Sequence, residues 1–220
     1  MDATPGRNVF VQGASRGLGL AFVRALLERE GARRIFASAR APEHSPGLAA
    51  LREQYAERLH LVRLDVRDEA SIEAAARRVR ETTLKLHLLL NVAGVLHDGE
   101  ALRPEKKLDD VDPALLRRAF EVNAFGPLLV AKHFASFLRH EARAVLGNVS
   151  ARVGSIGDNR LGGWYAYRAS KAAQNMFTRT LSIELARRAP NVRTSDATSS
   201  ALPASWRRWD TSGTSAVRAA

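Results

Sequence analysis

The stretch Asn8-Val-Phe-Val-Gln-Gly-Ala-Ser-Arg-Gly-Leu-Gly19 decides the fold. Its first residues form a short apolar strand pattern, three glycines follow, and an amphipathic helical pattern then continues to Gly31. Glycines let a backbone approach a pyrophosphate, and a helix N-terminus attracts one through its free N–H groups and its dipole. The stretch therefore predicts a dinucleotide-binding turn between a strand and a helix. The alternative is a plain tight turn, because the spacing Gly-x-x-x-Gly-x-Gly differs from the Gly-x-Gly-x-x-Gly fingerprint.

Strand and helix patterns alternate along the rest of the chain. Further strands are expected at Arg34–Ala39, Leu59–Leu64, Leu86–Leu90 and Ala144–Val149. This alternation predicts an α/β fold with a Rossmann-type, doubly wound parallel sheet. Ligands of such sheets bind beyond the carboxyl ends of the strands. The residues that stand at expected strand ends are Gly13, Arg40, Asp65 and Asn91.

Composition narrows the class of protein. A chain of 220 residues suits one α/β domain. The absence of cysteine excludes disulfides and thiolate metal sites, so we expect no metal site and a cytoplasmic location. No apolar run approaches the ~20 residues of a membrane span, and we expect no signal peptide and no membrane partner. The net charge of +11 comes from arginines scattered over helices, which favours solvated helix faces and an anionic cofactor over nucleic acid.

Two arginines point to the kind of dinucleotide. An acid about 20 residues past the glycines binds the ribose of NAD, whereas an arginine nearby accommodates the 2′-phosphate of NADP. Here Ala39 and Arg40 end the second strand, and Arg16 lies inside the glycine turn. Because a doubly charged phosphate is repelled by Asp and bound by Arg, we predict NADP, with NAD less favoured. The alternative is that both arginines are solvated surface residues.

A candidate acid/base pair lies in Tyr165-Ala-Tyr-Arg-Ala-Ser-Lys171, at the start of a long helical pattern. Tyr167 and Lys171 are four residues apart, so on a helix they share one face. An ammonium beside a phenol lowers a tyrosine pKa from about 10, and such a tyrosine exchanges protons with a substrate oxygen near neutral pH. The alternative is a surface pair on an amphipathic helix.

Asn123 lies among apolar residues of another predicted helix, which Asp112-Pro113 begins. A buried asparagine needs hydrogen-bond partners, and it could hold a lysine or a water in place. The alternative is an asparagine that is satisfied within its own helix.

Together these residues resemble the short-chain dehydrogenase/reductase family from Asn8 to about Val192. The motifs that carry the resemblance are Gly13-x-x-x-Gly17-x-Gly19, Asp65, Asn91-x-Ala93-Gly94, Asn123, the serine region near Ser150, and Tyr167-x-x-x-Lys171. The loop before Tyr167 is most similar to the C-factor-like and short carbonyl reductase branch. The resemblance implies an NADP-dependent oxidoreductase, of carbonyl reductase or alcohol dehydrogenase type, that acts on a small molecule as a homodimer or tetramer.

The resemblance also implies a role for each residue. The implied catalytic residues are Tyr167 as acid/base, Lys171 as the group that lowers its pKa, Asn123 as anchor of a relay water, and Ser150. The glycines Gly13, Gly17 and Gly19 would cradle the pyrophosphate. Asp65 and Val66 would contact the adenine, Asn91 would support the adenosine side, and Lys171 would hold the nicotinamide ribose. The remaining expected cofactor contacts are Ser15, Arg16, Leu18, Arg40, Ala93, Gly94 and Tyr167.

The chain departs from the family pattern after the fifth strand. The family usually shows Ser-Ser-x-x-Gly there, and the second serine polarises the substrate oxygen. The sequence Ser150-Ala-Arg-Val-Gly154 places Ala151 at that position, so Ser150 is our candidate and Ser155 its rival. Strand alternation turns Ser150 to the opposite side from its neighbour unless the strand has already ended. Loss of such a donor reduces the rate roughly a hundredfold or more.

A second departure follows Asn191-Val-Arg193. No apolar strand pattern and no Pro-Gly follow, and the composition is rich in Ser, Thr and Ala. We therefore expect a dinucleotide-binding domain over residues 1–193 and a disordered tail over 194–220, truncated or out of frame, with the last strands of the fold absent. The alternative function is a catalytically weak or inactive dinucleotide-binding regulatory protein, or a truncated relative.

Overall fold

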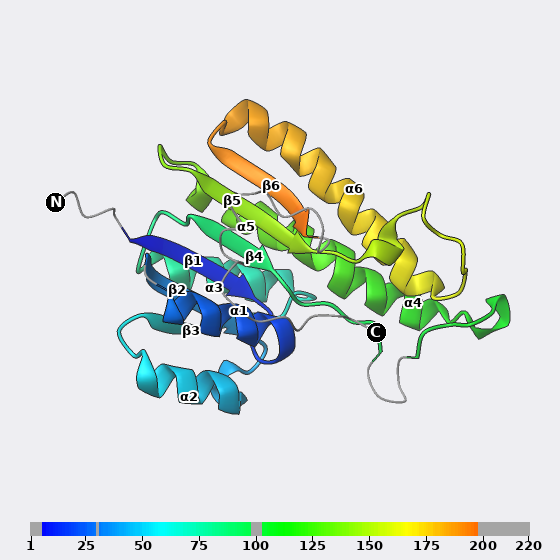
Figure 1. The fold of residues 1–220 in the computed structure, drawn as a ribbon, viewed down its shortest axis with the longest axis horizontal. Coiled ribbons are helices and arrows are strands. Elements are labelled where there is room, and N and C mark those ends of the chain that lie inside the picture. The colour runs from blue at the N-terminus through cyan, green and yellow to red at the C-terminus, as the bar shows by residue number, and fades with distance from the viewer. Residues whose placement is uncertain (1–5, 30, 98–102, 198–220) are drawn as a thin grey trace.

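A computed structural model describes residues 6–29, 31–97 and 103–197. Within these residues one parallel sheet has the order β3-β2-β1-β4-β5-β6 (Figure 1). Its strands are β1 (Arg7–Gln12), β2 (Ala32–Ala39), β3 (Leu59–Arg63), β4 (Leu88–Asn91), β5 (Ala144–Val149) and β6 (Val192–Ala197). This is the strand order of the Rossmann fold, in which the order reverses between β1 and β4. The predicted fold class is confirmed.

Helices cover both faces of the sheet. They are α1 (Gly17–Glu28), α2 (Pro46–Gln54), α3 (Glu69–Arg80), α4 (Pro113–Phe120), α5 (Gly126–Leu138) and α6 (Tyr165–Arg188). A π-helical turn, η3 (Glu121–Phe125), joins α4 to α5, and short 3-10 turns lie at η1 (Pro42–His44), η2 (Leu108–Asp110) and η4 (Arg152–Gly154). In the part of the chain that the structure describes, no helix is both long and apolar enough to cross a membrane.

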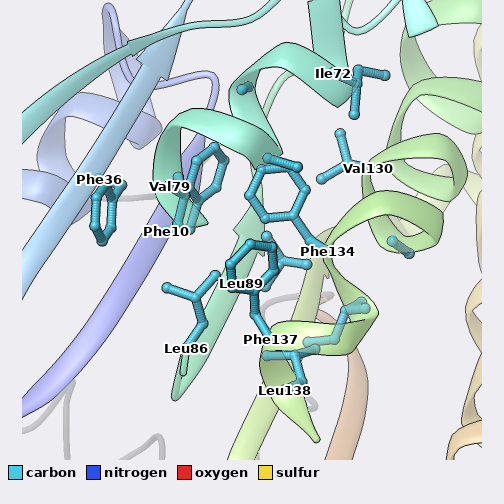
Figure 2. Close-up of a cluster of buried hydrophobic side chains, with 14 of the residues drawn as sticks. Phe10, Phe36, Ile72, Val79, Leu86, Leu89, Val130, Phe134, Phe137 and Leu138 are labelled. Carbon is cyan, nitrogen blue, oxygen red and sulfur yellow. The ribbon is translucent and has the colours of Figure 1, made fainter. Parts of the chain in front are cut away.

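Alternation along the strands assigns side chains to two cores. Val9 and Val11 belong to the core beneath α1 and α2. Phe10 points the other way, into the larger core beneath α3 and α5, where its ring centre lies 4.5 Å from that of Phe134. Figure 2 shows Phe10, Leu89 and Phe134 meeting in this larger core. Buried on both faces, the sheet holds its strand ends in fixed positions.

The expectation that the sixth strand is missing is wrong. β6 pairs in parallel with β5 from Ala144↔Val192 to Val149↔Ala197. Its sequence, Val-Arg-Thr-Ser-Asp-Ala, is polar, and a strand at the edge of the described sheet tolerates such residues. The domain therefore extends past the boundary expected at residue 193. The rest of the expected tail, residues 198–220, lies outside the described residues.

Candidate active site

Polar side chains form one row across the carboxyl ends of four strands. The strand registers pair Gln12 with Ser38 and with Asn91, and Asn91 with Asn148. All four side chains are buried. Gln12 Oε1 accepts a hydrogen bond of 3.1 Å from Ala93 N, so the row ties the segment after β4 to the end of β1.

The turn after β1 is so tight that it requires glycine. A Cβ on Gly13, whose φ is +83°, would lie 2.5 Å from Ala93 N, and a Cβ on Gly19 would lie 2.0 Å from Gly13 O. Gly17 differs, because a Cβ there would meet nothing within 4 Å. Gly17 begins α1, and no side chain caps this helix. Within the described residues its first N–H groups are thus left without a side-chain acceptor, as a pyrophosphate site requires.

The two arginines of the predicted NADP site lie beside this turn. Arg16 precedes α1, and Arg40 follows β2, whose Ser38 O accepts hydrogen bonds from the N–H groups of Gly13 and Ala14. Both arginines are exposed, and no hydrogen bond or ion pair joins either guanidinium group to another described residue. Unpaired guanidinium groups beside an uncapped helix N-terminus fit a dinucleotide that carries a further phosphate.

Asp65 and Val66 follow the next strand, β3. Asp65 Oδ1 accepts a hydrogen bond of 3.0 Å from Arg67 N, and Oδ2 lies 3.5 Å from the Arg67 guanidinium, with the carboxylate partly exposed. Val66 is buried, since a Cβ on Gly126 would lie 2.7 Å from Val66 Cβ. The contact of Asp65 and Val66 with the adenine remains a prediction.

The side chain of Asn91 points into the protein. Its Nδ2 donates a hydrogen bond of 2.8 Å to Asn148 Oδ1, and its Oδ1 is buried with no protein partner. The alternation that turns Leu89 toward α3 and α5 turns Asn91 the same way. The amide joins β4 to β5. Its place among the cofactor contacts remains a prediction.

Helix α6 carries Tyr167 and Lys171 on one face, as predicted. Lys171 Nζ lies 5.9 Å from the centre of the Tyr167 ring. No hydrogen bond joins the Tyr167 hydroxyl to another described residue. Burial raises the pKa of Tyr167, and burial lowers the pKa of Lys171 to about 8.

In this structure burial is the cause that acts on the Tyr167 phenol, and it raises the pKa of that phenol. The phenol therefore keeps its proton at neutral pH, as a proton donor requires. The role of Lys171 in lowering the pKa of Tyr167 remains a prediction.

The Lys171 amine is held by two neutral acceptors. Nζ donates hydrogen bonds of 2.9 Å to Val149 O and of 2.9 Å to Gln174 Oε1. A Cβ on Gly94 would lie 3.5 Å from Nζ, so the segment after β4 passes beside the amine. Sequence analysis missed Gln174. Its position three residues after Lys171, on the same helix face, was the signal that could have found it.

Asn123 lies in the π-helical turn and is completely buried. Its Oδ1 accepts from Val95 N at 2.7 Å, and its Nδ2 donates to Val95 O at 2.9 Å and to Ser170 Oγ at 3.0 Å. Ser170 Oγ in turn donates to Tyr167 O at 2.9 Å. Asn123 thus clamps the segment after β4 to the helix that carries Tyr167. Its partners lie outside its own helix, and its role as anchor of a relay water remains a prediction.

The serine candidates do not meet Tyr167. Ser150 Oγ donates a hydrogen bond of 2.5 Å to Asn175 Oδ1, one turn beyond Lys171 on α6. Ser155 is exposed and follows η4. The proposed polarising role of Ser150 therefore remains a prediction, with its hydroxyl proton directed at the helix.

Known proteins are similar to this chain in sequence and in fold. The sequence model of the short chain dehydrogenase family matches residues 7–202, past the boundary that we expected at 193. The chain is 41% identical over 113 residues to 1-hydroxy-2-glutathionyl-2-methyl-3-butene dehydrogenase of a Rhodococcus species, which is 51% of this chain and 46% of that protein. It is 46% identical over 78 residues to the C-signal protein of Myxococcus xanthus, which is 36% of this chain and 47% of that protein.

A solved structure extends the likeness over most of the described fold. The NADPH-bound carbonyl reductase from chicken fatty liver superposes with a TM-score of 0.76 and 32% identity, over 85% of this chain and 73% of that one. The two curated relatives above, in contrast, are matched over about half of their length. The family match over residues 7–202, together with the glycine turn and the Tyr167/Lys171 face, shows that the chain belongs to the short-chain dehydrogenase/reductase family of oxidoreductases.

Proposed function

We propose that this protein is an NADP-dependent oxidoreductase that reduces the carbonyl group of a small molecule. The observation that carries the proposal is the Tyr167/Lys171 face of α6. This face and the open glycine turn both lie at the carboxyl ends of the strands. The choice of NADP is supported by the unpaired Arg16 and Arg40 and by the NADPH bound to the chicken carbonyl reductase. The chemistry is a two-electron reduction of a carbonyl to an alcohol.

The residues of the site divide this chemistry among them. When bound, NADPH supplies the hydride for the carbonyl carbon. Tyr167 donates its phenolic proton to the carbonyl oxygen, and its raised pKa keeps that proton in place at neutral pH. Below its pKa of about 8, Lys171 is positively charged and stabilises the phenolate that Tyr167 leaves behind. Turnover in the direction of reduction should therefore fall as the pH rises through about 8.

The rival function was a catalytically weak or inactive dinucleotide-binding protein. Two features of the sequence favour it, the alanine at position 151 and the expected absence of the last strands of the fold. The sixth strand is present and paired with β5, which weakens the second of these features. The intact Tyr167, Lys171 and Asn123 favour the enzyme.

We further propose that the protein forms a homodimer or tetramer and works in the cytoplasm. The oligomer is supported by apolar side chains that α6 leaves exposed on its outer face, namely Tyr165 at 41%, Met176 at 64% and Ile183 at 43%. The location is supported by the absence of cysteine, which fits a reducing compartment. Light scattering of the purified protein tests the oligomer.

Turnover with NADPH tests the proposal as a whole. A panel of aldehydes, ketones and quinones is offered with NADPH, and cofactor oxidation is followed by absorbance. We expect at least one class to be reduced, and Tyr167→Phe to serve as the matched control without activity. Binding of NADPH without turnover of any member of the panel would retire the enzyme and restore the rival function.

A further inference from the structure

We propose that Gln174 is a positioning residue, which holds the amine of Lys171 in place and governs how readily that amine keeps its proton. The proposal rests on the proposed function for its catalytic meaning. Its physical basis is a single buried contact, the hydrogen bond of 2.9 Å from Lys171 Nζ to Gln174 Oε1. Lys171 and Gln174 are 3% and 1% exposed, so water does not compete freely for either group.

The amine has little else to hold it. An ammonium carries three donors, and two of them are used, on Val149 O and on Gln174 Oε1. The backbone carbonyl cannot be removed by substitution of a side chain, so Gln174 is the adjustable partner. The third N–H of the ammonium group remains available to a ligand or to the Tyr167 side chain.

Every described element around the amine presents a neutral group to it. β5 contributes the carbonyl of Val149, the segment after β4 passes with Gly94, and η4 packs Gly154 against the Lys171 side chain. Tyr167, on the same helix, is the titratable neighbour. Burial is the cause that lowers the pKa of Lys171. In such a setting the dipole of one amide carbonyl carries unusual weight.

Gln174 is itself fixed by a buried polar chain. Thr178 Oγ1 donates to Gln174 O at 2.8 Å, and Asn148 Nδ2 donates to Thr178 Oγ1 at 2.8 Å. Asn148 Oδ1 accepts from Asn91 Nδ2 at 2.8 Å, which carries the chain across β5 to β4. The register between α6 and the sheet is thereby set one turn from the amine. The chain thus anchors the backbone of α6 at Gln174, while the printed contact of the Gln174 side-chain amide is its bond with Lys171 Nζ.

Two substitutions of Gln174 separate an electrostatic role from a purely structural one. Gln174→Met keeps the shape but removes the acceptor, so the pKa of Lys171 should fall by about one unit. Gln174→Glu places a carboxylate at the same contact, so the pKa of Lys171 should rise by about one to three units. Gln174→Met is the discriminating variant, because a residue that merely packs would leave the pKa of Lys171 unchanged there. Gln174→Glu tests whether the side chain at position 174 faces the amine.

Thr178→Val is the matched control. It breaks the same buried chain one turn farther along α6, without touching Lys171. We expect it to lower the stability of the protein while the pKa of Lys171 stays at the wild-type value. General loosening of the helix is thereby distinguished from loss of the contact itself.

The experiment is an NMR pH titration of the lysine side chains in the full chain without cofactor. The sequence holds five lysines, Lys85, Lys106, Lys107, Lys132 and Lys171, so carbon-13 labelling of lysine gives a readable spectrum. The Lys171→Arg variant identifies the signal of Lys171. We expect the order of its pKa to be Gln174→Met below wild type and Gln174→Glu above it. Equal values, or shifts of both variants in one direction, would overturn the proposal.

Two provisions keep the test decisive. If Gln174→Glu does not fold, Gln174→Met decides alone, because an unchanged or raised pKa of Lys171 in that variant overturns the proposal. The titration uses no dinucleotide. Failure of wild type to bind NADPH would therefore contradict the proposed function without affecting the result for Gln174. In an active enzyme, the upper pH limit of kcat should move with the pKa of Lys171 in each variant.

Discussion

The two sides of the candidate site, one at β1 and β2 and the other at α6, contrast in burial and in bonding. On the flank of β1 and β2, Arg16 and Arg40 are exposed, and their guanidinium groups have no partner among the described residues. On the flank of α6, Lys171, Asn123 and Gln174 are buried and bonded to one another or to backbone. An exposed cation stays solvated and costs little to leave unpaired, whereas a buried one must be satisfied. The first flank therefore takes its partners from the ligand, and the second is organised before any ligand arrives.

The largest effect is expected from removing the acid on the organised flank. Tyr167→Phe should reduce kcat by about 10²–10⁴-fold, since that is the usual contribution of a positioned general acid. NADPH affinity should change by less than about threefold, because the hydroxyl bonds to no other described residue. Steady-state kinetics and a fluorescence titration measure the two quantities. Activity near that of wild type would remove Tyr167 from its assigned role.

The next effect concerns the stability cost of the buried amine. The pKa of Lys171 is about 8 in the folded protein against an ordinary value of 10.5, so the unfolded chain binds more protons between these pH values. By linkage, the stability of wild type rises with pH across this window relative to a variant without the amine. Between pH 7 and 10.5 wild type should gain about 3 kcal/mol over Lys171→Met. Urea denaturation at both pH values measures the change, and parallel pH dependence in the two proteins would contradict it.

The sequence alone was enough to predict those features that depend on the spacing of residues along the chain. The apolar strands, the glycine turn and the i, i+4 pair of Tyr167 and Lys171 are local, so the parallel sheet and the shared helix face could be predicted. The direction of the Tyr167 pKa could not, because it depends on how deeply the fold buries the phenol.

The other features depend on contacts between residues that are far apart in the sequence. β6 is polar and has no local strand signal, and it becomes a strand because β5 offers it hydrogen bonds along the sheet edge. The bond between Asn91 and Asn148 joins residues far apart in the chain, and Gln174 alone on a helix does not reveal what its amide meets. The π-helical turn around Asn123 likewise follows from contacts with Val95 and Ser170.

On the open flank a charge reversal should change the preference between cofactors. Arg40→Asp replaces an unpaired cation by an anion where the 2′-phosphate of NADP is proposed to bind. The ratio of NADP to NAD affinity should fall about tenfold or more, with little change in stability, since the Arg40 guanidinium bonds to no described residue. Parallel titrations of the two cofactors provide the ratio. An unchanged ratio would show that Arg40 is not the phosphate clamp.

The smallest effect is expected at Ser150. Its hydroxyl donates to Asn175 on α6, so Ser150→Ala should lower kcat by less than about tenfold. A donor that polarises the substrate oxygen would instead cost about 10²–10³-fold. Kinetics of Ser150→Ala beside Ser155→Ala settle which serine, if either, faces the substrate. A loss of kcat near a hundredfold in Ser150→Ala would instead show that Ser150 polarises the substrate oxygen.

The central claim is that the site binds a nicotinamide dinucleotide. Titration of the purified protein with NADPH and with NADH, followed by nucleotide fluorescence, tests it most directly. The open glycine turn, with its unpaired arginines, should bind NADPH at least about tenfold more tightly than NADH. Folded protein with no affinity for either nucleotide would contradict the account, because Tyr167 and Lys171 would then face no cofactor.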